Sequence, residues 1–177
     1  MGDSMSKIQV DTIEGKTTAG SVAMPAGGHI IQTQYAVDLQ TNTDVTTASS
    51  SAFVDLSGMT VDITPKYSTS KILIMYSYHI HINGGSTGWI TTDTKLMRDS
   101  TNLIGENPVY GSGHREQHAG NYDQLIYVSK QYIDSPSSTS ELTYKVQGKV
   151  TQNTVSMSYN ADDNGTGGSM VVMEIAQ

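Results

Sequence analysis

Two stretches of the chain alternate apolar and polar residues with the two-residue period that is typical of a half-buried β-strand. One stretch covers residues 142–150 and the other covers residues 72–82. Their apolar faces carry Leu142, Tyr144, Val146 and Val150 in the first stretch and Ile72, Ile74, Tyr76, Tyr78, Ile80 and Ile82 in the second. The opposite face of the second stretch changes from apolar at Leu73 to polar at Ser77. We expect a strand of this kind at the centre of a sandwich or at a subunit interface.

Shorter runs with strand-like residues predict further strands, and turn-forming residues separate them. The further expected strands are Ile30–Val37, Met59–Thr64, Ile90–Arg98, Asp123–Ile133, Val155–Tyr159 and Met170–Ile175. The turn clusters are Thr64-Pro65-Lys66, Asn83-Gly84-Gly85, Asp134-Ser135-Pro136 and Asp162-Asp163-Asn164-Gly165. We interpret Thr41–Ser51 and Gly105–Gly120 as surface loops. About eight to ten strands with these turn signals predict an all-β fold, an antiparallel β-sandwich or jelly roll.

Residues 1–28 differ from the rest of the chain, because they are poor in aromatic residues and rich in Gly, Thr, Ser and Ala. Such a segment cannot build a core alone, so we expect an extended N-terminal docking arm that orders against a partner. Its apolar contacts for docking would be Val10, Ile13 and Val22. A loose terminus would have the same composition. The β-sandwich domain is expected over residues 29–177.

Charge and composition narrow the range of partners. The net charge is −7, with only ten Lys and Arg, and no basic patch stands out as nucleic-acid recognition requires. No stretch approaches the roughly 20 apolar residues of a membrane span, and Met1 to Val10 shows no apolar run of a secretory signal. Cysteine is absent, so stability must come from sheet packing and subunit contacts. We therefore expect that the protein neither binds nucleic acid nor inserts into a membrane.

The motifs of enzymes are also missing from the sequence. There is no Cys nucleophile, no Gly-x-Ser-x-Gly elbow and no phosphate-binding Gly-x-x-x-x-Gly-Lys-Ser/Thr loop. No pair of Asp or Glu residues lies in a sequence motif that is typical of an enzyme. We therefore expect a protein that is not an enzyme and carries no cofactor other than a candidate metal ion on a threefold axis.

An ordered series of short motifs resembles tail-fibre and virion-associated structural proteins of marine tailed phages. The motifs are Val10-Asp11-Thr12-Ile13, Thr17-Thr18-Ala19-Gly20, Pro25-Ala26-Gly27, Asp62-Ile63-Thr64-Pro65, Ser68 to Ile74, Leu96 to Thr101, Asp134-Ser135-Pro136, Thr143-Tyr144-Lys145-Val146 and Val172-Met173-Glu174-Ile175. The resemblance spans nearly the whole chain. It implies a virion location and a jelly-roll body like that of tumour-necrosis-factor-type (TNF-like) trimers, hence a homotrimer.

Within that class two roles are open. A short tail fibre or fibre tip would present Asn83–Gly88 and Gly105–Gly120 to a host surface glycan or protein, whereas a capsid decoration protein would clamp other virion proteins. Candidate residues for binding a partner or receptor are Asn83, Gly84, Trp89, Tyr110, His114, Arg115 and His118. The alternative outside the virion is a carbohydrate-binding jelly-roll lectin, for which Tyr35, Tyr110 and Trp89 are candidate sugar contacts, because such rings offer contact area with a polar tip.

The pair His79-Ile80-His81 is the sharpest candidate for metal binding. Both imidazoles point to the same side of a strand, and three chains around a threefold axis would offer six nitrogens, which suits an octahedral ion. Trimeric phage fibres and spikes similar to this chain use such a pair, whereas the alternative is that both histidines lie on a solvated face or form hydrogen bonds with neighbours. His114 and His118 have the zinc spacing of a helix but lie in an expected loop, and Asp162–Gly165 fits a tight turn better than a calcium site.

Overall fold

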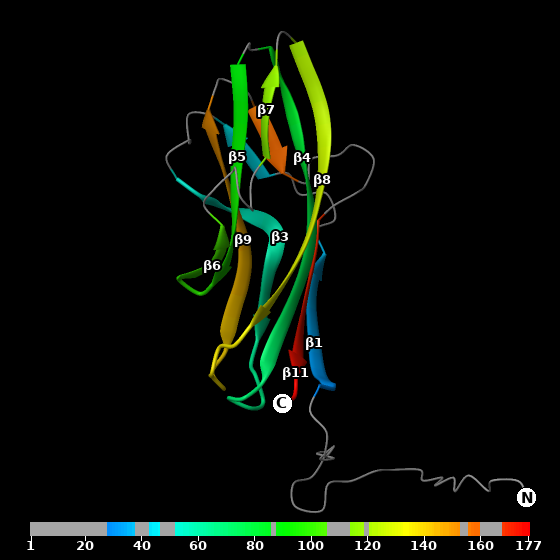
Figure 1. Cartoon of the computed structure of the whole chain (residues 1–177), viewed down its shortest axis with the longest axis vertical. Helices are drawn as coiled ribbons and strands as arrows, with labels where there is room; N and C mark the ends of the chain where they lie inside the picture. Colours follow the sequence, from blue (N-terminus) through cyan, green and yellow to red (C-terminus); the bar gives the residue numbers. More distant parts are fainter. Residues whose placement is uncertain are drawn as a thin grey trace, which may run out of the picture.

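The computed structural model describes residues 28–37, 43–46, 52–85, 88–105, 114–118, 121–152, 156–159 and 168–177, and all regular secondary structure in these ranges is β (Figure 1). The strands are β1 (Ile30–Val37), β2 (Thr43–Thr46), β3 (Val54–Ile63), β4 (Lys71–Gly85), β5 (Gly88–Arg98), β6 (Thr101–Gly105), β7 (His114–His118), β8 (Asn121–Asp134), β9 (Leu142–Gln152), β10 (Ser156–Tyr159) and β11 (Ser169–Ile175). The described part of the chain contains no helix, and therefore none that is long and apolar enough to cross a membrane.

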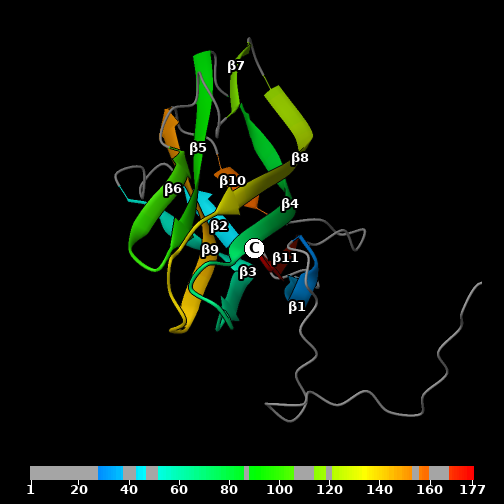
Figure 2. The same cartoon turned by 60° about the horizontal axis from the view of Figure 1, so that its bottom comes forward.

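The strands form two antiparallel sheets, which we call sheet A and sheet B. In sheet A, β8 pairs with β4 along one side, while β11 and then β10 pair with the other side of β4, and β1 and β2 pair with β11 and β10. In sheet B the order is β3-β9-β5-β6, and β7 extends the β5 edge beyond β6. Each sheet is thus four strands wide over much of its length, and the two layers face each other (Figure 2).

The order of the strands confirms the predicted fold class. The first strand of the fold, β1, pairs with the last, β11, and β3 pairs with β9, so that neighbours in space come from distant parts of the sequence. This interleaving between two sheets is the connectivity of a jelly-roll sandwich. The expected N-terminal arm lies outside the described residues up to Gly28, whose amide donates to the carbonyl of Ala176.

Three expectations about loops were wrong. Thr41–Ser51 contains β2 and Gly105–Gly120 contains β7, and both are short polar strands whose pairing comes from their neighbours β10 and β5. The expected turn Asn83-Gly84-Gly85 is extended backbone at the end of β4, because these residues continue the pairing with β8. β6 was not predicted, since its five residues show no clear alternation.

The core lies between the sheets and includes the apolar faces that the alternation predicted around Tyr76 and Tyr144. Its buried side chains are Leu56, Met59, Val61, Ile63, Ile72, Ile74, Tyr76, Tyr78, Ile80, Leu96, Leu142, Tyr144, Val146, Met170 and Val172. The rings of Tyr76 and Tyr78 stack with their centroids 6.2 Å apart. The Tyr78 hydroxyl lies 2.8 Å from the hydroxyl of Thr94, which connects β4 of sheet A to β5 of sheet B.

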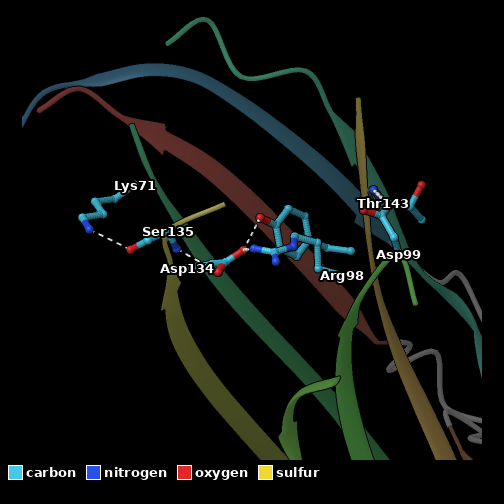
Figure 3. Close-up of polar contacts among 7 residues, drawn as sticks. Lys71, Arg98, Asp99, Asp134, Ser135 and Thr143 are labelled. Atoms are coloured by element: carbon cyan, nitrogen blue, oxygen red, sulfur yellow. Dashed lines mark hydrogen bonds and ion pairs between the residues drawn. The ribbon is translucent and has the colours of Figure 1, made fainter. Parts of the chain in front are cut away.

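A buried carboxylate joins the two sheets at one end of the sandwich (Figure 3). Asp134 Oδ2, at the end of β8, accepts hydrogen bonds from Arg98 of β5 at 2.6 Å and from the Tyr144 hydroxyl of β9 at 2.8 Å. Its other oxygen accepts from the amide of Ser135. Burial, together with the hydrogen bond to Asp134, raises the pKa of Tyr144, so that its hydroxyl stays a donor.

A second buried carboxylate, Glu174 of β11, points into the protein and is 0% exposed. Oε1 accepts hydrogen bonds from the amides of Lys66 and Tyr67 and from Ser70 Oγ, at 2.8, 3.2 and 2.7 Å. Oε2 accepts from the side-chain amide of Gln32 at 2.7 Å. Glu174 therefore ties β1 and the β3–β4 turn to β11.

We predict that Asp134→Ala lowers the free energy of unfolding by about 2–4 kcal/mol, because the Arg98 guanidinium and the Tyr144 hydroxyl lose their buried acceptor. Asp62→Ala is the matched control, since this exposed carboxylate accepts a single side-chain bond, from Thr143, and should cost less than about 1 kcal/mol. Urea unfolding of both variants measures the difference. Equal losses in the two variants would contradict the role given to Asp134.

Tyr78 provides a test of core burial by pH. Burial raises the pKa of Tyr78 to about 12 from an ordinary 10.0, and the bond to Thr94 only partly counters this. The folded state holds the phenol proton more tightly than the unfolded state does. The stability that Tyr78 contributes is therefore complete below pH 10 and is lost as the pH rises toward 12. In an ultraviolet titration Tyr78→Phe should remove a late-ionising group, and a loss of signal near pH 10 would show instead that the ring is solvated.

Candidate interaction face of sheet A

The outward face of sheet A is rich in apolar side chains over the part that lies beside residues 71–81 of β4 on β1, β11 and β8, and we call this part face A. It carries Ile30, Thr33, Tyr35 and Val37 of β1, Ser169, Val171, Met173 and Ile175 of β11, Lys71, Leu73, Met75, Ser77, His79 and His81 of β4, and Leu125, Tyr127, Ser129, Gln131 and Ile133 of β8. Direct cross-strand pairs place these residues in rows, one of which joins Tyr35, Val171 and Met75.

Large apolar side chains of face A lie open to solvent at its margins. Tyr35 is 73% exposed, Tyr127 is 67% exposed and Ile133 is 59% exposed. The central residues on β4 and β11 are half-buried by their neighbours in the sheet. Among the side chains just named, Lys71 is the one with a permanent charge, and it lies at one end, where Nζ donates to Ser135 Oγ at 2.7 Å (Figure 3).

The outward face of sheet B has the opposite character. Lys145 pairs with Asp55 at 2.9 Å, and Lys149 lies 3.6 Å from Asp93. Burial opposes the ionisation of Asp55, but hydrogen bonds from Gln147 and Lys145 outweigh it and lower the pKa of this carboxyl. The outward face of sheet B is thus charged and suited to contact with water. A contiguous, uncharged apolar surface is instead typical of an interaction site.

Two cations on sheet B also cover an aromatic ring. Lys95 Nζ lies 3.8 Å and Lys149 Nζ 4.5 Å from the centre of the Phe53 ring. This arrangement shields the one Phe of the chain from water through cation–π contacts. The exposed rings of face A, Tyr35 and Tyr127, receive no such contact from a Lys or Arg of the described residues. The contrast marks face A as the surface that a partner would cover.

The predicted metal ligands lie on face A and share one side of β4, as their spacing predicted. His79 is 1% exposed and packs against the Tyr127 ring, with ring centroids 5.9 Å apart, while His81 is half-buried. In the described part of one chain, no three His, Cys, Asp or Glu side chains gather to hold an ion. A shared ion at a threefold axis stays a prediction, and it would require His79 to be uncovered.

The predicted partner-binding residues gather at one end of the sandwich. Asn83 and Gly84 lie at the end of β4, paired with Asp123 and Tyr122 of β8. Trp89 lies at the start of β5, where it pairs with Gln117 of β7 (Figure 1). The fold therefore places these segments of β4, β5 and β7, which are separate in the sequence, at the same end of the sandwich.

The remaining predicted residues divide into two groups. His114, Arg115 and His118 belong to β7 rather than to a loop, and positions four apart in a strand are separated by about 13 Å, so the two histidines cannot share one zinc ion. Tyr110 of the receptor candidates and Val10, Ile13 and Val22 of the arm lie outside the described residues, as does Asp162–Gly165.

Face A as a whole was missed from the sequence, although its signal was present. In β11, Val171, Met173 and Ile175 alternate with Met170 and Val172, so both faces of the strand are apolar. The direction of Glu174 could not be read from this pattern, because an isolated carboxylate is ordinarily expected to point to water.

Comparisons with known proteins add little to this description. No family model and no curated protein matches the chain. Among solved structures, dimeric latent PorU from Porphyromonas gingivalis is 9% identical over 86% of this chain and 14% of its own, with a TM-score of 0.33. Infectious bursal disease virus, Gx strain, is 12% identical over 95% of this chain and 42% of its own, with a TM-score of 0.28. This chain thus spans less than half of either neighbour, and likenesses this distant carry no argument about function.

Proposed function

We propose that the chain is a structural, non-enzymatic virion protein of a tailed bacteriophage that assembles as a homotrimer through face A. The observation that carries the self-association is the contrast between the two outward faces: charged on sheet B, and apolar with a single lysine at its margin on face A. The virion location and the number of three subunits come from the resemblance of the sequence motifs to phage tail-fibre and virion-associated proteins.

The size of face A favours a second copy of the chain as its occupant. Four strands about 4.8 Å apart and roughly 30 Å of strand length give a flat area on the order of 600 Å², before side-chain relief is counted. A stable interface takes about 800 Å² from each partner, so a folded domain fits this area better than a single extended segment. Tyr and Met, both enriched in interface cores, line it.

The two ends of the sandwich fit an outward-projecting virion protein. Gly28, where the expected docking arm joins the sandwich, pairs with Ala176 at the end where β11 finishes. The partner-binding candidates of β4, β5 and β7 lie at the opposite end (Figure 1). Such a molecule would attach to the particle at one end and present strand ends at the other, as either a fibre tip or a capsid decoration protein.

The runner-up function is a carbohydrate-binding lectin outside the virion, and one observation favours it. Tyr35 and Tyr127 expose most of their rings on the same face. Aromatic rings of this kind can stack on sugars, but they serve an interface between subunits equally well. We rank self-association first, because the apolar residues between and beside the rings continue over the whole face.

We predict that Met75→Lys converts the oligomer to single chains. The new ammonium would be buried without a partner at the centre of face A, which weakens association by at least about 100-fold. Thr60→Lys is the control, because this position lies on the outward face of sheet B, two residues from Asp62. Native mass spectrometry and light scattering give the subunit number. A wild-type mass equal to that of one chain would contradict the homotrimer. A Met75→Lys variant that is still a trimer would show that the interface lies elsewhere.

The location on the particle is a separate prediction. Cryo-electron microscopy of virions that contain or lack this protein should show its density on the tail or on the capsid surface. Density on the tail supports the fibre tip, and density on the capsid supports the decoration protein. In both cases we expect the end of the sandwich that carries Gly28 to face the particle. Particles with identical density in the two preparations would contradict the virion function and leave the lectin.

A further inference from the structure

The strand β8 forms a long sheet edge that no described strand covers. Exposed edges invite pairing with another segment, and proteins protect them by short length, bulges or covering elements. β2, β6 and β7 have only four or five residues. β3 has a register shift between Asp55 and Thr60, and β1 is held to the segment after β3 by a bond from Gln32 Nε2 to the carbonyl of Thr64 at 2.7 Å. β8 pairs with β4 over 14 residues without a shift and contains no proline.

The inward side chains of β8 are less covered than their partners on β4. They pack against the core but stay half-buried, and they include Ile126, Val128 and Tyr132. Their cross-strand partners Ile80, Tyr78 and Ile74 are at most 3% exposed. Both strands belong to the same layer, so the difference arises at the flank of β8 where no described strand lies. One further strand at this flank would cover apolar area on both sides of β8, because Tyr127 is 67% exposed on face A.

We propose that β8 accepts residues 8–13 of a neighbouring copy as an added strand. This segment reads Ile-Gln-Val-Asp-Thr-Ile, and β-branched residues, which favour strands, make up most of it. It belongs to the expected docking arm, which lies outside the described residues. The inference rests on the proposed function and deepens it, because it names a second contact between copies of the homotrimer and the segment that makes it.

The order of the strands brings the arm of one copy close to β8 of the next. β1 and β8 are the two opposite margins of face A. In a ring of three copies, each copy presents one margin to the opposite margin of its neighbour. Gly28, which begins β1 and is held by the end of β11, lies at the same end of the sandwich as Asp134, because Glu174, Ile72 and Asp134 form one row across sheet A. The arm therefore starts near the end of the neighbouring β8.

The connection is also long enough. Fourteen residues separate Ile13 from Gly28 and can span up to about 46 Å when extended. Three strand spacings, which separate β1 from β8, amount to only about 14 Å. A strand of six residues pairs weakly alone, but a tether within one assembly raises its effective concentration to about the millimolar range. The main-chain groups along β8 would supply the hydrogen bonds, as they do when a peptide extends a sheet.

A photo-reactive benzophenone side chain at position 10 of the full chain, in place of Val10, identifies the strand that the arm contacts. Peptide mapping should find the cross-links within residues 121–134, in a product with twice the mass of one chain on a denaturing gel. The same group in place of Ala23, outside the proposed strand, is the control and should give no cross-link to β8. Cross-links from position 10 to β8 in a product with the mass of one chain would assign the arm to its own copy and overturn the inference.

Val10→Pro tests whether the contact is backbone pairing. Proline removes an amide donor and cannot continue a strand ladder, and a change in the arm leaves the described sandwich untouched. Hydrogen exchange of the β8 amides should become roughly tenfold faster than in wild type, because the amides on its open flank lose their acceptors. Ala23→Pro is the matched control and should exchange like wild type. Unchanged exchange in Val10→Pro would show that residues 8–13 do not pair with β8.

Light scattering of the same samples separates this inference from the proposed function. A trimer in which the probe at position 10 misses β8 overturns the inference and leaves the homotrimer standing. Another subunit number with the expected cross-link contradicts the homotrimer and supports the added strand. A benzophenone in place of Ser129 covers the remaining occupant of the edge. If it captures β8 of a second copy instead of residues 8–13, the edges pair with each other and the inference is wrong.

Discussion

The carboxylate of Glu174 determines which way the last strand faces, and the rest of sheet A depends on that choice. β11 is apolar on both faces, so hydrophobic burial alone hardly distinguishes its two orientations. A shift of one residue would turn Glu174 outward and leave the amides of Lys66 and Tyr67 without their acceptor. Because unsatisfied buried donors are costly, the four hydrogen bonds to Glu174 fix the register of β11 between β1 and β4. The same choice turns Val171, Met173 and Ile175 outward.

The distribution of charge in the sandwich is therefore unusual. Two carboxylates, Asp134 and Glu174, are inside, each with several donors, while the residues of face A include a single permanent charge, Lys71 at its margin. Each internal carboxylate binds groups from distant parts of the chain, so it holds a connection that a disulfide holds in other small domains. In the proposed homotrimer, a second copy would cover the apolar residues of face A. Association of the copies would then add to the stability of each folded chain.

The sequence predicted the parts of the fold that depend on local alternation. The strands around Tyr76 and Tyr144 were predicted because apolar residues recur at every second position. β2, β6 and β7 could not be predicted so well, because such short strands owe their conformation to the backbone groups of their neighbours. Of the residues on face A, the sequence singled out only His79, His81 and Tyr35 as binding candidates. Face A spans four strands, so its continuity depends on strand order and register, which alternation within one strand does not encode.

The pairing of β1 with β11 has a consequence for folding during synthesis on the ribosome. On the ribosome, β1 is made first among the described strands and must wait for its partner until residues 169–175 have left the exit tunnel. β4 likewise cannot complete sheet A until the same residues arrive. Folding of such a topology is dominated by contacts between distant residues and is correspondingly slow. During that interval the core residues of β4 lack the strand that completes their sheet, so they stay accessible to other unfolded chains.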